Sequence, residues 1–170
     1  MRAEGTASGR TGQGTIPLYT PEQRRRRDAT RWTLVQGILA PVQFLIFLAS
    51  LALVLRYLST GEGAGVATLS IVAKTMALYA IMLTGSIWEK VVFDKWLFAR
   101  PFFWEDVFSM VVIALHTAYL AALVAGIGTE RERMLLALAA YATYAINAGQ
   151  FILKLRAARL EGRPRLAVAG

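Results

Sequence analysis

The stretch TLVQGILAPVQFLIFLASLALVLRYL, residues 33–58, decides the fold class of this 170-residue chain. It carries one charged side chain, Arg56, close to its end. Crossing roughly 30 Å of hydrocarbon takes about 20 helical residues, so this run is long enough to span a membrane. Backbone polar groups in lipid must find partners within their own segment, which makes the span a helix.

Three more runs of the same kind follow, over residues 66–88, 107–127 and 134–155. Hydrophobic residues make up 56% of the chain, above the roughly 45–50% of soluble domains. Gly61 and Gly63 indicate a tight turn after the first span. Thr129 with Glu132 fits a capping box before the fourth. The sequence therefore predicts an all-α integral membrane protein with four transmembrane helices.

The two ends of the chain are polar and basic. Residues 1–19 begin with a Gly/Ser/Thr-rich run, typical of a disordered tail. Thr20, Pro21 and Gln23 predict the start of a basic surface helix over residues 20–32. Its arginines fit either anionic lipid head groups or a ligand that bears a carboxylate. The membrane domain is expected over residues 33–155 and a basic C-terminal tail over 156–170.

The distribution of Lys and Arg predicts the orientation, because cytoplasmic loops are enriched in these residues. The two ends and the central loop hold fifteen of the nineteen, and the other two connections with their span ends hold three. Both termini and the central loop are therefore expected in the cytoplasm, and the protein in a bacterial cytoplasmic or intracytoplasmic membrane. The fifteen are Arg2, Arg10, Arg24, Arg25, Arg26, Arg27, Arg31, Lys90, Lys95, Arg100, Lys154, Arg156, Arg159, Arg163 and Arg165.

Several classes of function are weakened by the composition. The chain has no cysteine and one histidine, which excludes thiolate chemistry and bis-histidine haem ligation. It has no Gly-rich phosphate loop, and its charge of +8 is better explained by membrane topology than by nucleic acid. Gln36 and Gln43 stand in the first span, where the small multidrug exporters need a carboxylate.

Polar side chains in the spans point to a cavity open to the cytoplasm. Glu105, Ser109 and His116 fall on one helical stripe, because eleven residues are only about 20° from three full turns. Asn147 and Gln150 share a face of the fourth span. Each feature also has a purely structural explanation: amides bridge helices, acids in a first helical turn complement its dipole, tryptophans line membrane interfaces, and a lone histidine packs in the core.

Three segments carry a family resemblance. LYTPEQRRRRDATRWTLVQGILAPVQFLIFLASLALVLRYL (18–58), SIWEKVVFDKWLFARPFFWEDVFSMVVIALHTAYLAAL (86–123) and YAINAGQFILKLRAARLEG (144–162) resemble the 3-vinyl bacteriochlorophyllide hydratases of bacteriochlorophyll biosynthesis. The resemblance implies a hydro-lyase that adds water to the 3-vinyl group of a magnesium chlorin or bacteriochlorin, giving a 3-(1-hydroxyethyl) group. It implies no resident cofactor, since magnesium arrives in the substrate macrocycle, and no metal site of the protein's own.

Chemistry then selects candidate site residues. Hydration needs a neutral acid, a positioned water and a base, and neighbouring carboxyls at a low-dielectric boundary favour the protonated form. Glu105, alone or with Asp106, is the expected proton donor, with Glu89 across the loop. His116 is expected to ligate magnesium or to order water. The candidate catalytic residues are Glu89, Glu105, Asp106 and His116. The candidate substrate-binding residues are Gln36, Trp88, Arg100, Phe103, Trp104, Asn147 and Gln150.

Two rival functions use the same residues differently. A non-catalytic pigment carrier or assembly factor would need the aromatics and His116 but no protonated carboxyl. A small transporter is disfavoured, because Lys74 is the one charged residue deep in a span. The expected partners are the magnesium (bacterio)chlorophyllide and the lipid bilayer, with other pigment-biosynthesis enzymes as further candidates and nucleic acid excluded.

Overall fold

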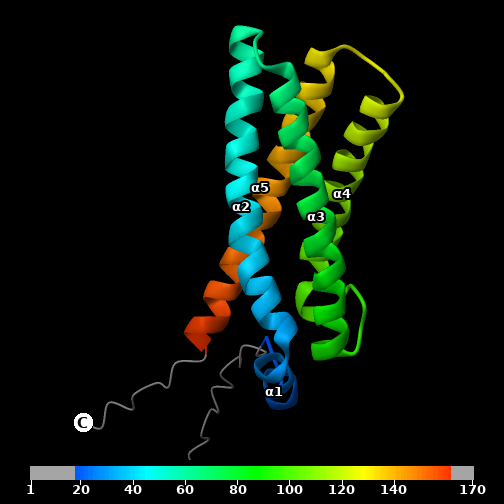
Figure 1. The fold of residues 1–170 in the computed structure, drawn as a ribbon. Coiled ribbons are helices and arrows are strands. Elements are labelled where there is room, and N and C mark those ends of the chain that lie inside the picture. The colour runs from blue at the N-terminus through cyan, green and yellow to red at the C-terminus, as the bar shows by residue number, and fades with distance from the viewer. Residues whose placement is uncertain (1–17, 162–170) are drawn as a thin grey trace, which may run out of the picture.

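The computed structural model describes residues 18–161, with side chains through residue 156, and every regular element in that range is helical (Figure 1). The elements are α1 (Pro21–Ala29), α2 (Arg31–Thr60), α3 (Ala64–Phe93), the 3-10 turn η1 (Arg100–Phe102), α4 (Phe103–Val124) and α5 (Glu130–Glu161). Four of the helices in the described part are long and apolar enough to cross a membrane. The predicted all-α class and its four spans are confirmed.

The long helices pack as two hairpins. Contacts are most extensive between α2 and α3 and between α4 and α5, and the hairpins meet where α2 touches α5 and α3 touches α4. Gly61 and Gly63, with φ of 76° and 82°, make the turn between α2 and α3. These are left-handed conformations that favour glycine. The predicted capping boxes at Thr20 and Thr129 both form.

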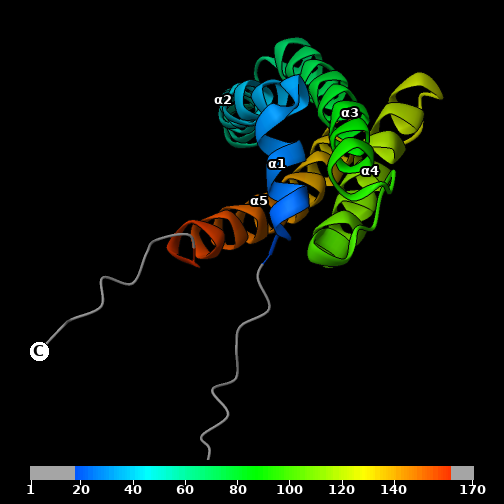
Figure 2. The ribbon, with the colours of Figure 1, turned by 90° about the horizontal axis from the view of Figure 1, so that it is seen from below.

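The bundle has two distinct ends. The end of α5, helix α1 and the connection from α3 to α4 gather at one of them, and the other two connections lie at the opposite end (Figure 1). Seen along the bundle, α1 crosses the first of these ends, where it contacts α3 (Figure 2). This is the end where the sequence concentrates its arginines and aromatics.

Three predicted boundaries need correction. Tyr19 was assigned to a disordered tail, but its ring is buried against Phe93 and Phe102. The basic helix predicted over 20–32 breaks at Thr30, which ends α1 through its backbone N–H and caps α2 through its side chain. Helix α5 continues to Glu161, past the expected start of a tail at residue 156. Residues 1–17 and 162–170 lie outside the described range.

Candidate active site

The connection from α3 to α4 is a short loop with an unusual backbone. Asp94 ends α3 with φ 61°, and Phe98 has φ 59°. A left-handed conformation is uncommon for residues other than glycine and requires support from its surroundings. At Asp94 part of that support is an ion pair with Lys90 at 2.6 Å. At Phe98 it comes from the carboxyl group of Asp106, with that of Glu89 holding the next residue, Ala99.

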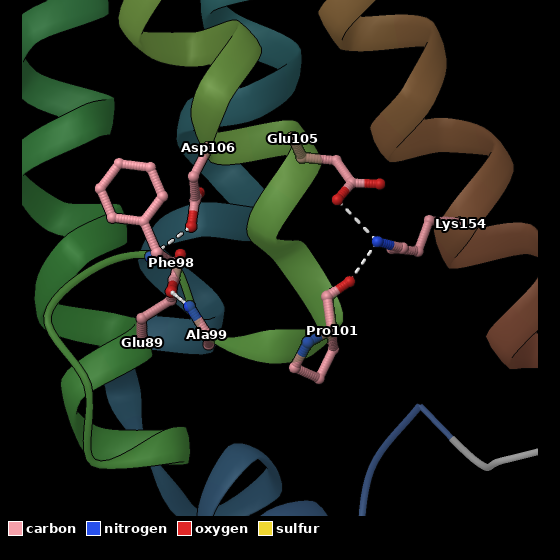
Figure 3. Close-up of polar contacts among 7 residues, drawn as sticks. All are labelled: Glu89, Phe98, Ala99, Pro101, Glu105, Asp106 and Lys154. Atoms are coloured by element: carbon pink, nitrogen blue, oxygen red, sulfur yellow. Dashed lines mark hydrogen bonds and ion pairs between the residues drawn. The ribbon is translucent and has the colours of Figure 1, made fainter.

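Glu89 and Asp106 hold this loop through hydrogen bonds to its backbone. A carboxylate oxygen of Asp106 accepts the backbone N–H of Phe98 at 2.7 Å, and one of Glu89 accepts that of Ala99 at 3.1 Å (Figure 3). The two side chains adjoin each other and are only 5% and 3% exposed, respectively. The fold therefore joins one acid from the end of α3 to one from the start of α4. We call Glu89 and Asp106 the acid pair.

Glu105 points to the other side of α4, toward α5 (Figure 3). Lys154 donates to its carboxylate at 2.6 Å and also to the backbone carbonyl of Pro101. Consecutive residues on a helix lie about 100° apart, so Glu105 and Asp106 face different neighbours. Of the predicted acids, the structure thus pairs Asp106 with Glu89 and gives Glu105 a cation.

The predicted polar stripe of α4 is buried along its length. Glu105, Ser109 and His116 all lie inside the bundle, and Asn147 donates to the Ser109 hydroxyl at 2.8 Å. His116 is eleven residues from Glu105, about 16 Å along the axis. Its Nδ1 lies 2.8 Å from the carbonyl of Val112. The structure therefore does not bring His116 together with the acids.

The aromatic residues divide into an inner and an outer group. Trp88 packs against Phe93 and Phe102 and donates its indole N–H to Thr33 at 2.9 Å. Phe98, Phe103 and Trp104 instead face outward, and Trp104 is 67% exposed. The ring centroids of Phe98 and Phe103 lie 5.8 Å apart, and those of Phe103 and Trp104 lie 5.5 Å apart. We call Phe98, Phe103 and Trp104 the outer aromatic face. Arg100, the first residue of η1, is exposed.

Two other predicted binding residues, Gln36 and Gln150, lie away from the acid pair. Gln36 donates to the Thr84 hydroxyl at 2.7 Å and so joins α2 to α3. The side-chain oxygen of Gln150 is buried and has no partner among the described residues. Neither side chain is hydrogen-bonded to the acid pair or to the loop between α3 and α4.

The sequence reasoning missed two contributors. Lys154 entered the prediction only as one of the basic residues that set the orientation, although an acid at the edge of a span is itself a signal that a cation lies nearby. Tyr19 carried no signal, because its role depends on how α1 folds over α3. Beside Tyr19 is an open hollow, lined also by Pro21, Arg24, Arg25 and Asp28. The Arg27 guanidinium lies 4.8 Å from the centre of the Tyr19 ring.

Comparison with known proteins identifies the family. A family model described as 2-vinyl bacteriochlorophyllide hydratase matches residues 19–157. A protein of that name from Cereibacter sphaeroides is 69% identical over 85% of this chain and 89% of its own length. Another from Rhodobacter capsulatus is 67% identical over 85% of this chain and 84% of its own. No solved structure matches. The chain belongs to the 2-vinyl bacteriochlorophyllide hydratase family.

Proposed function

We propose that this protein hydrates the vinyl group of a bacteriochlorophyllide, converting it to a 1-hydroxyethyl group. The vinyl carbon is numbered 2 in the relatives' names and 3 in the numbering used above. The observation that carries the proposal is 67–69% identity over most of the chain to two proteins named for this activity. The substrate is the magnesium macrocycle, and the protein needs no resident cofactor.

The reaction sets clear demands on the site. A proton is added to the terminal vinyl carbon, the adjacent carbon becomes a cation conjugated with the ring, and water attacks that carbon and releases a proton. A positioned acid typically contributes about 10²–10⁴ in rate. The protein must therefore present a proton and a water beside a flat apolar ring.

We assign the proton donor to the acid pair. Two adjoining buried carboxyls favour a state with one proton between them, because two negative charges side by side in a buried site repel each other. Glu105, the donor expected from the sequence, is less suited, because its carboxyl group is engaged in an ion pair with Lys154. Since Phe98 and Ala99 cover the acid pair, the loop has to move for the vinyl group to reach it.

The outer aromatic face is the proposed binding surface for the macrocycle. Its three rings adjoin the loop that covers the acid pair, and aromatic faces stack on flat conjugated ligands. Exposed Arg100, or the arginines of α1 beside Tyr19, can pair with the substrate carboxylate. His116 is not assigned to magnesium, because it is fully buried among the helices and distant from this face.

The orientation completes the proposal. The structure places α1, the acid-pair loop and the end of α5 at one end of the bundle, and the distribution of Lys and Arg assigns that end to the cytoplasm. The substrate would then reach the site from the cytoplasmic leaflet of a bacterial cytoplasmic or intracytoplasmic membrane.

The test is hydration by the purified protein in lipid nanodiscs. Vinyl pigment is added, and the hydroxyethyl product is followed by chromatography and mass spectrometry, with empty nanodiscs as the control. The proposal expects product with a mass gain of one water. Pigment that binds without conversion would instead establish the non-catalytic carrier.

A further inference from the structure

Six buried side chains inside the bundle have hydrogen-bonding capacity that no described residue uses: Tyr119, one turn beyond His116 toward the far end of α4, and five others. The unpartnered atoms of these five include two donors and three acceptors, if the histidine is the tautomer that donates from Nδ1 to Val112. We call these five residues the inner polar cluster. The atoms are Gln43 Nε2, Lys74 Nζ, His116 Nε2, Asn147 Oδ1 and Gln150 Oε1.

Hydrogen bonds between helices fix the relative heights of these residues. On α2 and α3, the Ser50–Ser70 and Gln36–Thr84 contacts bracket Gln43 and Lys74, so these two lie about one turn apart in height. The Lys74 ammonium lies 3.8 Å from the centre of the Tyr144 ring. Tyr144 is one turn from Asn147 on α5.

His116 and Gln150 extend the cluster along the bundle. The His116 ring lies 5.8 Å from that of Tyr141, one turn from Tyr144. Gln150 follows Asn147 by one turn, toward the end where Lys154 meets Glu105. The unpartnered atoms therefore form a series from the middle of the bundle toward the end that holds the acid pair.

Leaving these groups without partners would be costly. A buried polar atom without a hydrogen bond destabilises the folded protein, and a lysine inside a membrane span is rare and usually functional. Lys74 has no exposed surface, and the described residues offer it no carboxylate within salt-bridge distance. Another molecule has to satisfy these atoms.

The mixture of donors and acceptors identifies that molecule. An anion would need donors only and a metal cation acceptors only, whereas water both donates and accepts. Buried waters in proteins typically make about three hydrogen bonds to otherwise unsatisfied polar groups. We propose that the inner polar cluster is an internal water site, and that it supplies the water consumed in hydration. The supply role rests on the proposed function; the water site itself does not.

The water site is tested without pigment, by X-ray hydroxyl-radical footprinting of the full-length protein in nanodiscs in H₂¹⁸O. Radicals formed from bound water label adjacent side chains. Tyr141 and Tyr144 are buried, yet we expect both to gain ¹⁸O, with exposed Trp96 reporting the radical dose. Labelled Trp96 with neither tyrosine labelled would overturn the proposal.

A variant connects the water site to the reaction. Lys74→Met keeps a similar length without the amine, and we expect it to lower ¹⁸O at Tyr144 about fivefold and turnover about tenfold, with an unchanged pigment Kd. Gln43→Leu serves the same purpose if Lys74→Met fails to accumulate. Lost label with parental turnover would overturn the supply role. A parent protein that is labelled but makes no product would overturn the proposed function and leave the water site standing.

Discussion

Lys154 near the end of α5 and Glu105 at the start of α4 form an ion pair of 2.6 Å, with the glutamate side chain 8% exposed and the lysine 26% exposed. The same ammonium reaches the carbonyl of Pro101 in η1. One side chain thus fastens the α5 helix to the segment that leads into α4. This contact stabilises the two sides of the bundle end that carries the candidate site.

Breaking the Glu105–Lys154 pair from the glutamate side is expected to lower stability more than activity. Glu105→Gln leaves a partly buried ammonium without its anion, at a cost of about 1–3 kcal/mol. Thermal unfolding in nanodiscs measures the loss, and turnover should stay within about fivefold of the parent. Glu105→Gln/Lys154→Met should recover part of the stability, because no unpaired charge remains. A loss of turnover of a hundredfold or more at parental stability would restore Glu105 as the proton donor.

Removing the titrating proton from the acid pair is expected to abolish most turnover. Asp106→Asn and Glu89→Gln should each lower kcat by about 10²–10⁴, the usual contribution of a general acid. Asp94→Asn is the matched control, because Asp94 is an acid of the same loop whose side chain is 77% exposed and paired with Lys90. Equal rates in Asp106→Asn, Glu89→Gln and Asp94→Asn would exclude the acid pair as the donor.

The outer aromatic face is expected to determine pigment affinity. An aromatic contact contributes about 0.5–1.5 kcal/mol beyond area burial, so Trp104→Leu or Phe103→Leu should raise the pigment Kd by up to about tenfold. Fluorescence quenching in nanodiscs gives the Kd. Phe44→Leu is the control, because Phe44 is similarly exposed but lies on α2, in another part of the bundle. If Phe44→Leu weakens binding as much, the face is not the binding surface for the pigment.

The orientation can be tested at the two turns opposite the acid-pair loop. Reporter domains fused at Gly63 and Gly128 should be active on the periplasmic side. Fusions at the chain's two ends should report the cytoplasm. A cytoplasmic signal from either glycine fusion would contradict the orientation inferred from Lys and Arg.

The helices were predictable because each is determined by its own segment. Length, apolar content and the caps at Thr20 and Thr129 are local properties, so the four spans and the starts of α1 and α5 could be inferred from the sequence. The stripe of Glu105, Ser109 and His116 follows from helical periodicity alone, and all three are buried.

The pairing of side chains between helices was not predictable in the same way. Glu105 and Asp106 are neighbours in sequence, yet they face different helices, and the partner of each depends on how α3 and α5 pack against α4. The break at Thr30 was also missed, since Thr30 and its neighbours contain no proline or glycine to mark it. The side-chain pairings depend on contacts between helices, which cannot be inferred from the residue pattern of one segment.

The joint at Thr30 has a mechanical consequence. Because this one residue ends α1 and caps α2, no flexible linker separates the arginine-bearing helix from the first span. With one residue between the two helices, a change in the tilt of α2 would also displace the adjoining end of α1. Spans adjust to bilayer thickness largely by tilting, so a thinner or thicker membrane would raise or lower the row from Arg24 to Arg27 relative to the head groups. Lipid composition and the height of that row are thereby coupled through a single residue.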